Sequence, residues 1–433
     1  MKRDSKTKKY GLFLTPVEVF NKYIYDYIKD KINDYVFVDF FCGSGNLVLP
    51  ILDHISPEQR NEYFKNHIFL FDILQNQVEL AIKNAVNLGV DETTARQNIK
   101  VRDTIKDYPK ELVEKFGGKL FHITNPPYGN VHFIGRSEYK ESMKYFTGRY
   151  EKFQDLYQLA LINDFDNGLK NMIYIIPTNF INGDASANKI RNEFFTKYTI
   201  KKAISFEKQI FEETGLTTSI FFFERIEKQL DEITFINKKI GYNYEKGVET
   251  TLVKKYNYRN GWQALEWIKN HTKSDGLEAD FKLKMKEVEE NKGDIKASFY
   301  IPNSEEYKDF SINQSLYDKL KANPLYIRIV DGGSKEKKAG LYPIEDLKCD
   351  GIISADLHRI SAMQVFLKQK LAREQINKLI DLFNKRLNYL RDLTDSDFLL
   401  TFQTPYGNGY IKKYLSIKQA KEILKTISLS DLQ

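Results

Sequence analysis

Four short runs that favour strands lie in the first third of the chain, and a polar residue follows each of them. The runs and the residues that follow them are 35–38 before Asp39, 67–71 before Asp72, 98–102 before Asp103 and 119–124 before Asn125. The segments between them favour helices, and strands that alternate with helices form a parallel sheet covered on both faces. Because the carboxyl ends of parallel strands lie at one edge of a sheet, the four polar residues are expected to border one cleft.

The fourth run leads into the turn Asn125-Pro126-Pro127-Tyr128-Gly129. Each proline fixes its backbone φ angle and removes an N–H donor, so the turn is expected to be rigid. Asn125 carries an amide oxygen, Pro126 offers a backbone carbonyl and Tyr128 provides a flat ring. Together these groups suit an exocyclic amine on a planar ring.

The first run is followed by a glycine turn, Gly43-Ser44-Gly45, and then by an apolar segment. The glycines let a ligand approach the backbone closely, and Asp39 can accept a hydrogen bond from an amine or a hydroxyl. Asp72 ends the second strand, where nucleotide-type cofactors have their ribose hydroxyls bound. The turn and the strand-end acids together favour a cofactor cleft over independent caps or solvated loop residues.

A helix is expected to start at Thr15-Pro16. Threonine is a favourable N-cap, and proline suits the first helical position. The hydroxyl of a threonine at a helix start can also reach a ligand carboxylate, a use that a cap signal alone does not establish.

Three further strands are expected at residues 172–176, 199–206 and 219–224, which makes a doubly wound α/β sheet of seven strands. After about residue 230 the alternation of strands and helices stops, and basic pairs and charge runs appear. A chain of 433 residues also exceeds the usual size of one domain. We therefore expect one domain over residues 1–230 and a second, mixed α/β domain over residues 231–433.

The composition sets limits on partners and location. The net charge of +7, from 66 basic and 59 acidic residues, is a mild bias towards a polyanionic partner and fits a solvated lysine-rich surface equally well. Two cysteines, Cys42 and Cys349, cannot support a disulfide framework or a zinc cluster, so we expect no metal site and a cytoplasmic location. No signal-peptide core and no apolar run of about 18 residues occur, so no membrane association is expected.

In these motifs, the chain resembles the gamma-type adenine-N6 DNA methyltransferases of restriction-modification systems. The order of the Thr-Pro segment, the Gly-Ser-Gly turn and the Asn-Pro-Pro-Tyr turn carries the resemblance over roughly residues 9–230. Segments 155–157, 176–180 and 189–191 look like later blocks of that family. The resemblance implies a Rossmann-like methyltransferase sheet, S-adenosylmethionine as cofactor, and a C-terminal target-recognition domain.

The resemblance also assigns roles residue by residue. For the cofactor, the resemblance implies that the methionine end is held by Thr15, Pro16, Asp39, Gly43 and Gly45. It implies that Asp72 binds the ribose and that Asp103 binds the cofactor adenine. The catalytic turn is Asn125, Pro126, Pro127 and Tyr128. Stacking on a flipped base falls to Tyr128 and, as a weaker match, to Phe211. The implied partner is double-stranded DNA, with a cognate restriction endonuclease encoded separately, and the chain is expected to act as a monomer.

The chemistry agrees with that assignment. The lone pair of adenine N6 is conjugated into the ring and is a poor nucleophile. If Asn125 Oδ1 and the Pro126 carbonyl accept the two amine protons, the nitrogen becomes pyramidal and its lone pair turns towards the sulfonium methyl. The rate enhancement then comes mainly from positioning. To reach this turn the base must leave the duplex, which costs roughly a few kcal/mol of free energy.

Other substrates and one other class of protein are also compatible with these residues. Cytosine N4, an RNA base or a protein glutamine are planar amines or amides that a related turn could hold. The roughly 200 residues after the sheet argue against a compact glutamine enzyme. A DNA-specificity protein without catalysis is the rival from another class, and the intact acids and Asn-Pro-Pro-Tyr turn argue against it. Cys42 lacks the preceding proline of a cytosine-C5 nucleophile, and His122 is expected to be a packed side chain.

Overall fold

The computed structural model describes residues 15–131, 140–184, 186–210, 216–302, 304–331, 338–354, 361–403 and 411–433. The chain divides into two compact units, Met1–Arg259 and Asn260–Gln433. Each unit is described by itself. No helix among the described residues is long and apolar enough to cross a membrane.

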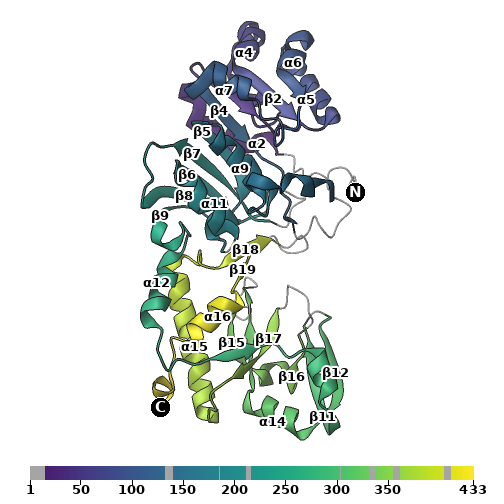
Figure 1. Ribbon diagram of the computed structural model, residues 1–433, viewed down its shortest axis with the longest axis vertical. Helices are drawn as coiled ribbons and strands as arrows, with labels where there is room; N and C mark the ends of the chain where they lie inside the picture. Colours follow the sequence, from purple (N-terminus) through teal and green to yellow (C-terminus); the bar gives the residue numbers. More distant parts are fainter. Residues whose placement is uncertain are drawn as a thin grey trace. The chain divides into compact units, whose positions relative to one another are not determined.

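The first unit is built on one sheet in the order β3-β2-β1-β4-β5-β7-β6-β8-β9 (Figure 1). Its strands are β1 Val36–Asp39, β2 Ile68–Asp72, β3 Ile99–Val101, β4 Leu120–Thr124, β5 Asn171–Pro177, β6 Tyr198–Phe206, β7 Thr218–Arg225, β8 Glu232–Ile240 and β9 Glu245–Val253. Strands β1 to β5 pair in parallel, whereas β7 runs antiparallel to both β5 and β6. All seven strands expected from the sequence are present.

The sheet is wider than the seven strands predicted. Strand β8 pairs in parallel with β6, and β9 pairs antiparallel with β8. Strand β8 buries Ile233 and Phe235 and exposes Glu232 and Thr234 between and beside them. A strand with one face in solvent mixes polar and apolar residues, so its sequence is less apolar than that of a central parallel strand. The first unit therefore continues to Arg259 rather than ending near residue 230.

Helices cover both faces of the sheet and create two separate cores. The α-helices are α2 Val17–Val19, α3 Tyr25–Ile28, α4 Arg60–His67, α5 Gln75–Asn87, α6 Glu92–Asn98, α7 Lys110–Phe116, α9 Leu156–Asp166, α10 Asn179–Asn182 and α11 Ser186–Phe194. Along β1, Val36 and Val38 face one core while Phe37 faces the other. Such two-sided burial explains why the parallel strands are continuous apolar runs.

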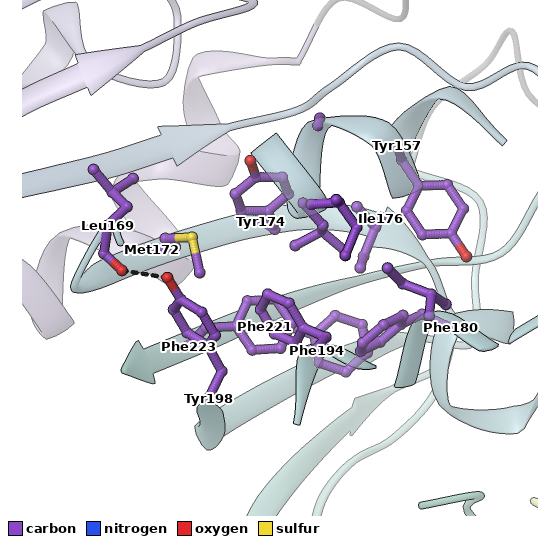
Figure 2. Close-up of a cluster of buried hydrophobic side chains, with 14 of the residues drawn as sticks. Tyr157, Leu169, Met172, Tyr174, Ile176, Phe180, Phe194, Tyr198, Phe221 and Phe223 are labelled. Atoms are coloured by element: carbon purple, nitrogen blue, oxygen red, sulfur yellow. Dashed lines mark hydrogen bonds between the residues drawn. The ribbon is translucent and has the colours of Figure 1, made fainter. Parts of the chain in front are cut away.

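Aromatic side chains dominate the core on the α9 side. Figure 2 shows Phe180, Phe194, Tyr198, Phe221 and Phe223 packed together. The rings of Phe194 and Tyr198 stack with centroids 4.5 Å apart, and the Tyr198 hydroxyl donates to the Leu169 carbonyl at 2.5 Å. Ring packing therefore fills this part of the core.

The second unit contains a four-stranded antiparallel sheet, two three-stranded sheets and several helices (Figure 1). Its strands are β10 Ala279–Phe281, β11 Lys292–Ile301, β12 Glu306–Ile312, β13 Leu325–Arg328, β14 Val330–Asp331, β15 Gly340–Pro343, β16 Gly351–Ile352, β17 Ala362–Leu367, β18 Leu400–Gln403 and β19 Ile411–Tyr414. Its α-helices are α12 Trp262–His271, α13 Met285–Glu290, α14 Gln314–Ala322, α15 Arg373–Thr394 and α16 Ile417–Leu424. Helix α15 packs Leu379, Phe383 and Leu387 into the core of this unit.

Candidate functional site

A narrow cavity opens at the carboxyl edge of the sheet in the first unit. The residues that line it are Phe40, Phe41, Asp72, Ile73, Arg102, Asp103, Thr104, Ile105, Pro127, Ser142, Tyr145 and Leu156. It lies where the strand order reverses between β1 and β4, the place where ligands bind in open α/β sheets. Three residues singled out by the sequence, Asp72, Asp103 and Pro127, border this one cavity.

The glycine turn after β1 is held by the acid at the end of β2. Gly43 donates its N–H to Asp72 Oδ2 at 2.9 Å, and Leu74 donates its N–H to Asp72 Oδ1 at 2.9 Å. Burial raises the pKa of the Asp72 carboxyl, while these backbone donors oppose the rise. Asp72 therefore fixes two turns that border the cavity.

Gly45 adopts a backbone conformation that other residues rarely accept. Its φ angle is +86°, and a Cβ added there would lie 2.5 Å from Leu49 Cδ1 and 2.8 Å from Leu49 Cγ. We expect Gly45→Ala to lower the free energy of unfolding by about 1–3 kcal/mol, because alanine combines an unfavourable φ with a steric clash. Chemical denaturation of both proteins measures the difference. Gly117→Ala is the matched control, since its φ is +53° and its Cβ would meet nothing within 4 Å. Equal losses for the two variants would show that φ strain alone matters.

Asp39 connects the ends of β1 and β4. Its Oδ1 accepts hydrogen bonds from the Thr124 hydroxyl at 2.6 Å and from the Phe41 N–H at 2.9 Å. The side chain is 1% exposed, and burial raises the pKa of its carboxyl from 3.8 to about 6. At neutral pH the chain therefore keeps a buried carboxylate beside the glycine turn.

The raised pKa of Asp39 predicts a stability difference that depends on pH. Asparagine can keep an oxygen acceptor for Thr124 and Phe41 while removing the buried charge. The folded protein holds the Asp39 proton more tightly than the unfolded chain, so wild-type stability falls as the pH rises from about 4 to about 6. Asp39→Asn should be the more stable protein above pH 6, by up to roughly 3 kcal/mol at about 1.4 kcal/mol per pKa unit. Urea denaturation at pH 4 and pH 8 measures this. A difference that is the same at both values would contradict the assignment.

The Asn-Pro-Pro-Tyr turn is joined to the N-terminal segment through Thr15. Asn125 donates from Nδ2 to Thr15 Oγ1 at 3.0 Å, and Asn46 donates from Nδ2 to the Thr15 carbonyl at 2.8 Å. Thr15 is not the N-cap that the sequence indicated. The helix begins at Val17 after Pro16, which occupies the cap position without a side-chain hydrogen bond. The hydroxyl instead contacts Asn125, which is 110 positions away in sequence.

Tyr128 is turned into the protein rather than towards solvent. Its side chain is 5% exposed, and burial raises the pKa of its phenol well above the usual value. The Tyr128 hydroxyl lies 2.5 Å from Asn125 Oδ1 and 2.7 Å from the carbonyl oxygen of Ile175 in β5. Because a hydroxyl has one proton, it can donate to only one of the two at a time. The contact orients the amide oxygen of Asn125.

Asp155 holds the other end of the turn. It precedes α9 in a capping box with Gln158, and its Oδ1 accepts the Gly129 N–H at 3.0 Å. Asn130 forms a β-bridge with Asp155, and the Val131 N–H donates to the Gln154 carbonyl at 2.9 Å. Asp155 was absent from the residues singled out for the site, although an acid just before an apolar helix is a recognisable cap signal.

Of the other residues that the sequence pointed to, Asp103 lines the cavity. Asp103 accepts a hydrogen bond at Oδ2 from the Tyr145 hydroxyl at 2.8 Å, so Tyr145 covers this side of the cavity. Phe211 lies outside the described residues. Cys42 is buried and unpaired with another cysteine, and burial raises the pKa of its thiol well above the usual value, which makes it a poor nucleophile.

The class of this protein follows from its fold and its family. The doubly wound sheet brings two strand-end acids, Asp72 and Asp103, to one cavity, and Pro127 of the turn that begins at Asn125 borders the same cavity. The chain belongs to the N-6 DNA methylase family, whose model matches residues 2–309. The resemblance to adenine-N6 DNA methyltransferases is thereby confirmed.

Solved structures that are similar to this chain have low sequence identity. A modification subunit of a putative type I restriction enzyme from Vibrio vulnificus is 16% identical, with a TM-score of 0.38 over 61% of this chain and 54% of that one. The type IIG restriction endonuclease BpuSI is 14% identical, with a TM-score of 0.43 over 95% and 58%. The type IIL restriction-modification enzyme MmeI in complex with DNA is 12% identical, with a TM-score of 0.49 over 87% and 65%.

This chain thus spans about half the length of the modification subunit. A search of curated protein sequences found no match.

Proposed function

We propose that this chain transfers a methyl group from S-adenosylmethionine to N6 of an adenine that has left double-stranded DNA. The observation that carries the proposal is the common cavity bordered by Asp72, Asp103 and Pro127, with Asn125 at the start of the adjoining turn. The reaction needs an acceptor for an amine beside acceptors for the ribose and adenine of the cofactor.

The residues around the cavity fit the proposed cofactor. Asp72 offers carboxylate oxygens for ribose hydroxyls, and Asp103 offers an acceptor for an adenine amine. Phe40, Ile105 and Leu156 supply apolar walls for a planar base. The buried carboxylate of Asp39 and the Gly43-Ser44-Gly45 turn suit the methionine part, together with Thr15-Pro16. When bound, the cofactor would supply an electrophilic methyl group on a positively charged sulfur.

Catalysis by the chain's own groups would consist of orientation and hydrogen-bond acceptance. The Nδ2 of Asn125 donates to Thr15, which leaves Oδ1 as the end of the amide that can accept from a substrate amine. The Tyr128 hydroxyl is 2.5 Å from that oxygen and 2.7 Å from the Ile175 carbonyl. An incoming amine would take the place at Oδ1 while the hydroxyl keeps its bond to Ile175. The Pro126 carbonyl would serve as the second acceptor, and the two acceptors together would orient the lone pair of the substrate nitrogen.

The rest of the molecule would serve DNA binding. We assign target recognition to the region after the catalytic sheet, and base stacking to Tyr128 and Phe211. A separately encoded endonuclease, action as a monomer and a cytoplasmic location complete the proposal. The basic residues that outnumber acidic ones by seven are compatible with a polyanionic substrate.

Methyl transfer is the direct test of the proposal. The protein is incubated with tritiated S-adenosylmethionine and duplex DNA of mixed sequence, and the labelled nucleosides are separated. We expect label in N6-methyladenine. Label in N4-methylcytosine would correct the base, label in RNA or protein would correct the substrate, and no label in any of them would overturn the proposal.

A further inference from the structure

A buried carboxylate lies on α9 at the centre of a polar network outside the cavity. Asp164 is 1% exposed, and its Oδ2 accepts from the Tyr174 hydroxyl at 2.6 Å while its Oδ1 accepts from the Tyr108 hydroxyl at 2.9 Å. Its third partner is the fully buried His122 on β4, with Nδ1 at 2.7 Å from Oδ2. A buried carboxylate costs stability unless donors compensate it, so this arrangement calls for a reason.

The network sets the tautomer of His122. The Asp164 carboxylate accepts a hydrogen bond from Nδ1 of His122, so Nδ1 carries the ring proton. The other ring nitrogen, Nε2, can therefore accept a hydrogen bond. The backbone N–H of Phe40 donates to this Nε2 at 3.1 Å. Phe40 follows Asp39 and lines the cavity. The pair of His122 and Asp164 therefore presents one acceptor, His122 Nε2, to the backbone N–H of Phe40 in the turn after β1.

The carbonyl of the same residue is also held by a side chain. The Thr104 hydroxyl donates to the Phe40 carbonyl at 2.8 Å, and Asn163 Nδ2 donates to the carbonyls of Thr104 at 3.3 Å and Ile105 at 3.0 Å. Asn163 and Asp164 are neighbours on α9. One turn of this helix thus holds the loops after β1 and after β3, and both loops line the cavity.

We propose that His122 and Asp164 are positioning residues for cofactor binding, acting through the Phe40 backbone on the turn that carries the cavity wall. The proposal rests on the proposed function, because the affinity for S-adenosylmethionine is the quantity through which a displaced turn is detected. An apolar side chain at position 122 would fill the same space between Phe40 and Tyr174 but would leave the Phe40 N–H without its acceptor. Packing alone does not require the histidine.

The test compares three variants for the KM of S-adenosylmethionine and for kcat at saturating cofactor. His122→Leu removes the acceptor and keeps apolar bulk. His122→Gln can accept from Phe40 through Oε1 and donate to Asp164 through Nε2, so it should restore the function. Tyr198→Phe is the control in the same core. Its hydroxyl contacts the Leu169 carbonyl, the Asp164 backbone carbonyl and Arg225, but neither the Asp164 carboxylate nor the turn after β1.

We expect His122→Leu to raise the KM for the cofactor about tenfold, with kcat at saturating cofactor within about threefold of wild type. His122→Gln should return the KM to within about threefold of wild type. Loss of folded protein lowers the active fraction, and so kcat, but leaves KM unchanged, which separates positioning from stability. A KM for His122→Leu within twofold of wild type, or a Gln variant no better than Leu, would overturn the proposal.

A second variant keeps the test decisive if His122→Leu does not fold. Thr104→Val has the shape of the original side chain and loses only the hydroxyl that donates to the Phe40 carbonyl. It should raise the cofactor KM about threefold or more with an unchanged melting temperature to within about 3 °C, and an unchanged KM would count against the proposal. If wild-type protein itself does not bind S-adenosylmethionine in calorimetry, the proposed function fails, and this result is distinct from either outcome above.

Discussion

Asn125→Ala is expected to reduce kcat for methyl transfer by about 10²–10³ while the dissociation constant of S-adenosylmethionine stays within about threefold of wild type. The reason is that Asn125 Oδ1 is proposed to accept from the amine only as its nitrogen becomes pyramidal, and removing one preset hydrogen-bonding group of this kind typically costs that factor. Single-turnover kinetics at saturating cofactor and DNA measure the step, and calorimetry measures cofactor binding.

A control is needed because Asn125 also contacts Thr15. Its Nδ2 donates to Thr15, so alanine also frees the Thr15 hydroxyl. Asn46→Ala removes the other side-chain bond to Thr15, at its carbonyl, and leaves Asn125 intact. We expect this control to lose far less turnover. If Asn125→Ala methylates DNA at close to the wild-type rate, or if both variants lose the same factor, the assigned role of Asn125 is wrong.

The second large effect is expected for Asp72→Ala, which should weaken cofactor binding by about 10–100-fold. Alanine removes the proposed acceptor for ribose hydroxyls, and a hydrogen bond to a charged group contributes roughly 1.5–3 kcal/mol. It also releases the N–H groups of Gly43 and Leu74, so the two turns beside the cavity lose their common anchor. Calorimetric titration with S-adenosylmethionine measures the change.

Asp107→Ala is the matched control for this variant. Asp107 is an exposed acid near the same edge that pairs with Arg102 and does not line the cavity. Its removal should leave the cofactor affinity within about twofold of wild type. An unchanged affinity in Asp72→Ala would count against the ribose assignment, and an equal loss in both variants would point to a general effect of negative charge.

The strand-end residues could be predicted because the information is local. Apolar runs followed by Asp39, Asp72 and Asn125 define strand ends, and parallel strands bring their carboxyl ends to one edge whatever the helices between them do. The glycine turn is equally local, since a φ of +86° at Gly45 requires the residue type seen there.

The errors arose where a long-range contact outweighed a local signal. Thr15 has the properties of an N-cap, but its hydroxyl is used by Asn125 across the fold. Residues 232–253 were assigned to a second domain because the alternation of strands and helices stops near residue 230. Only the pairing of β8 with β6 and of β9 with β8 shows that they continue the sheet. The hydroxyl of Tyr128 contacts the Ile175 carbonyl in β5, a partner 47 positions away that the local sequence does not indicate.

By itself, the sequence determined the class of fold and the edge of the sheet at which the candidate site lies, because strand periodicity, proline and glycine act on a few neighbouring residues. Only the tertiary structure decided which groups hold the Asn-Pro-Pro-Tyr turn and the cavity walls in place. Asp155 reaches Gly129, and Asp164 acts through His122 on Phe40, across distances in sequence of 26, 42 and 82 residues. Such contacts depend on how β4 and α9 pack, and packing is a property of the whole folded core.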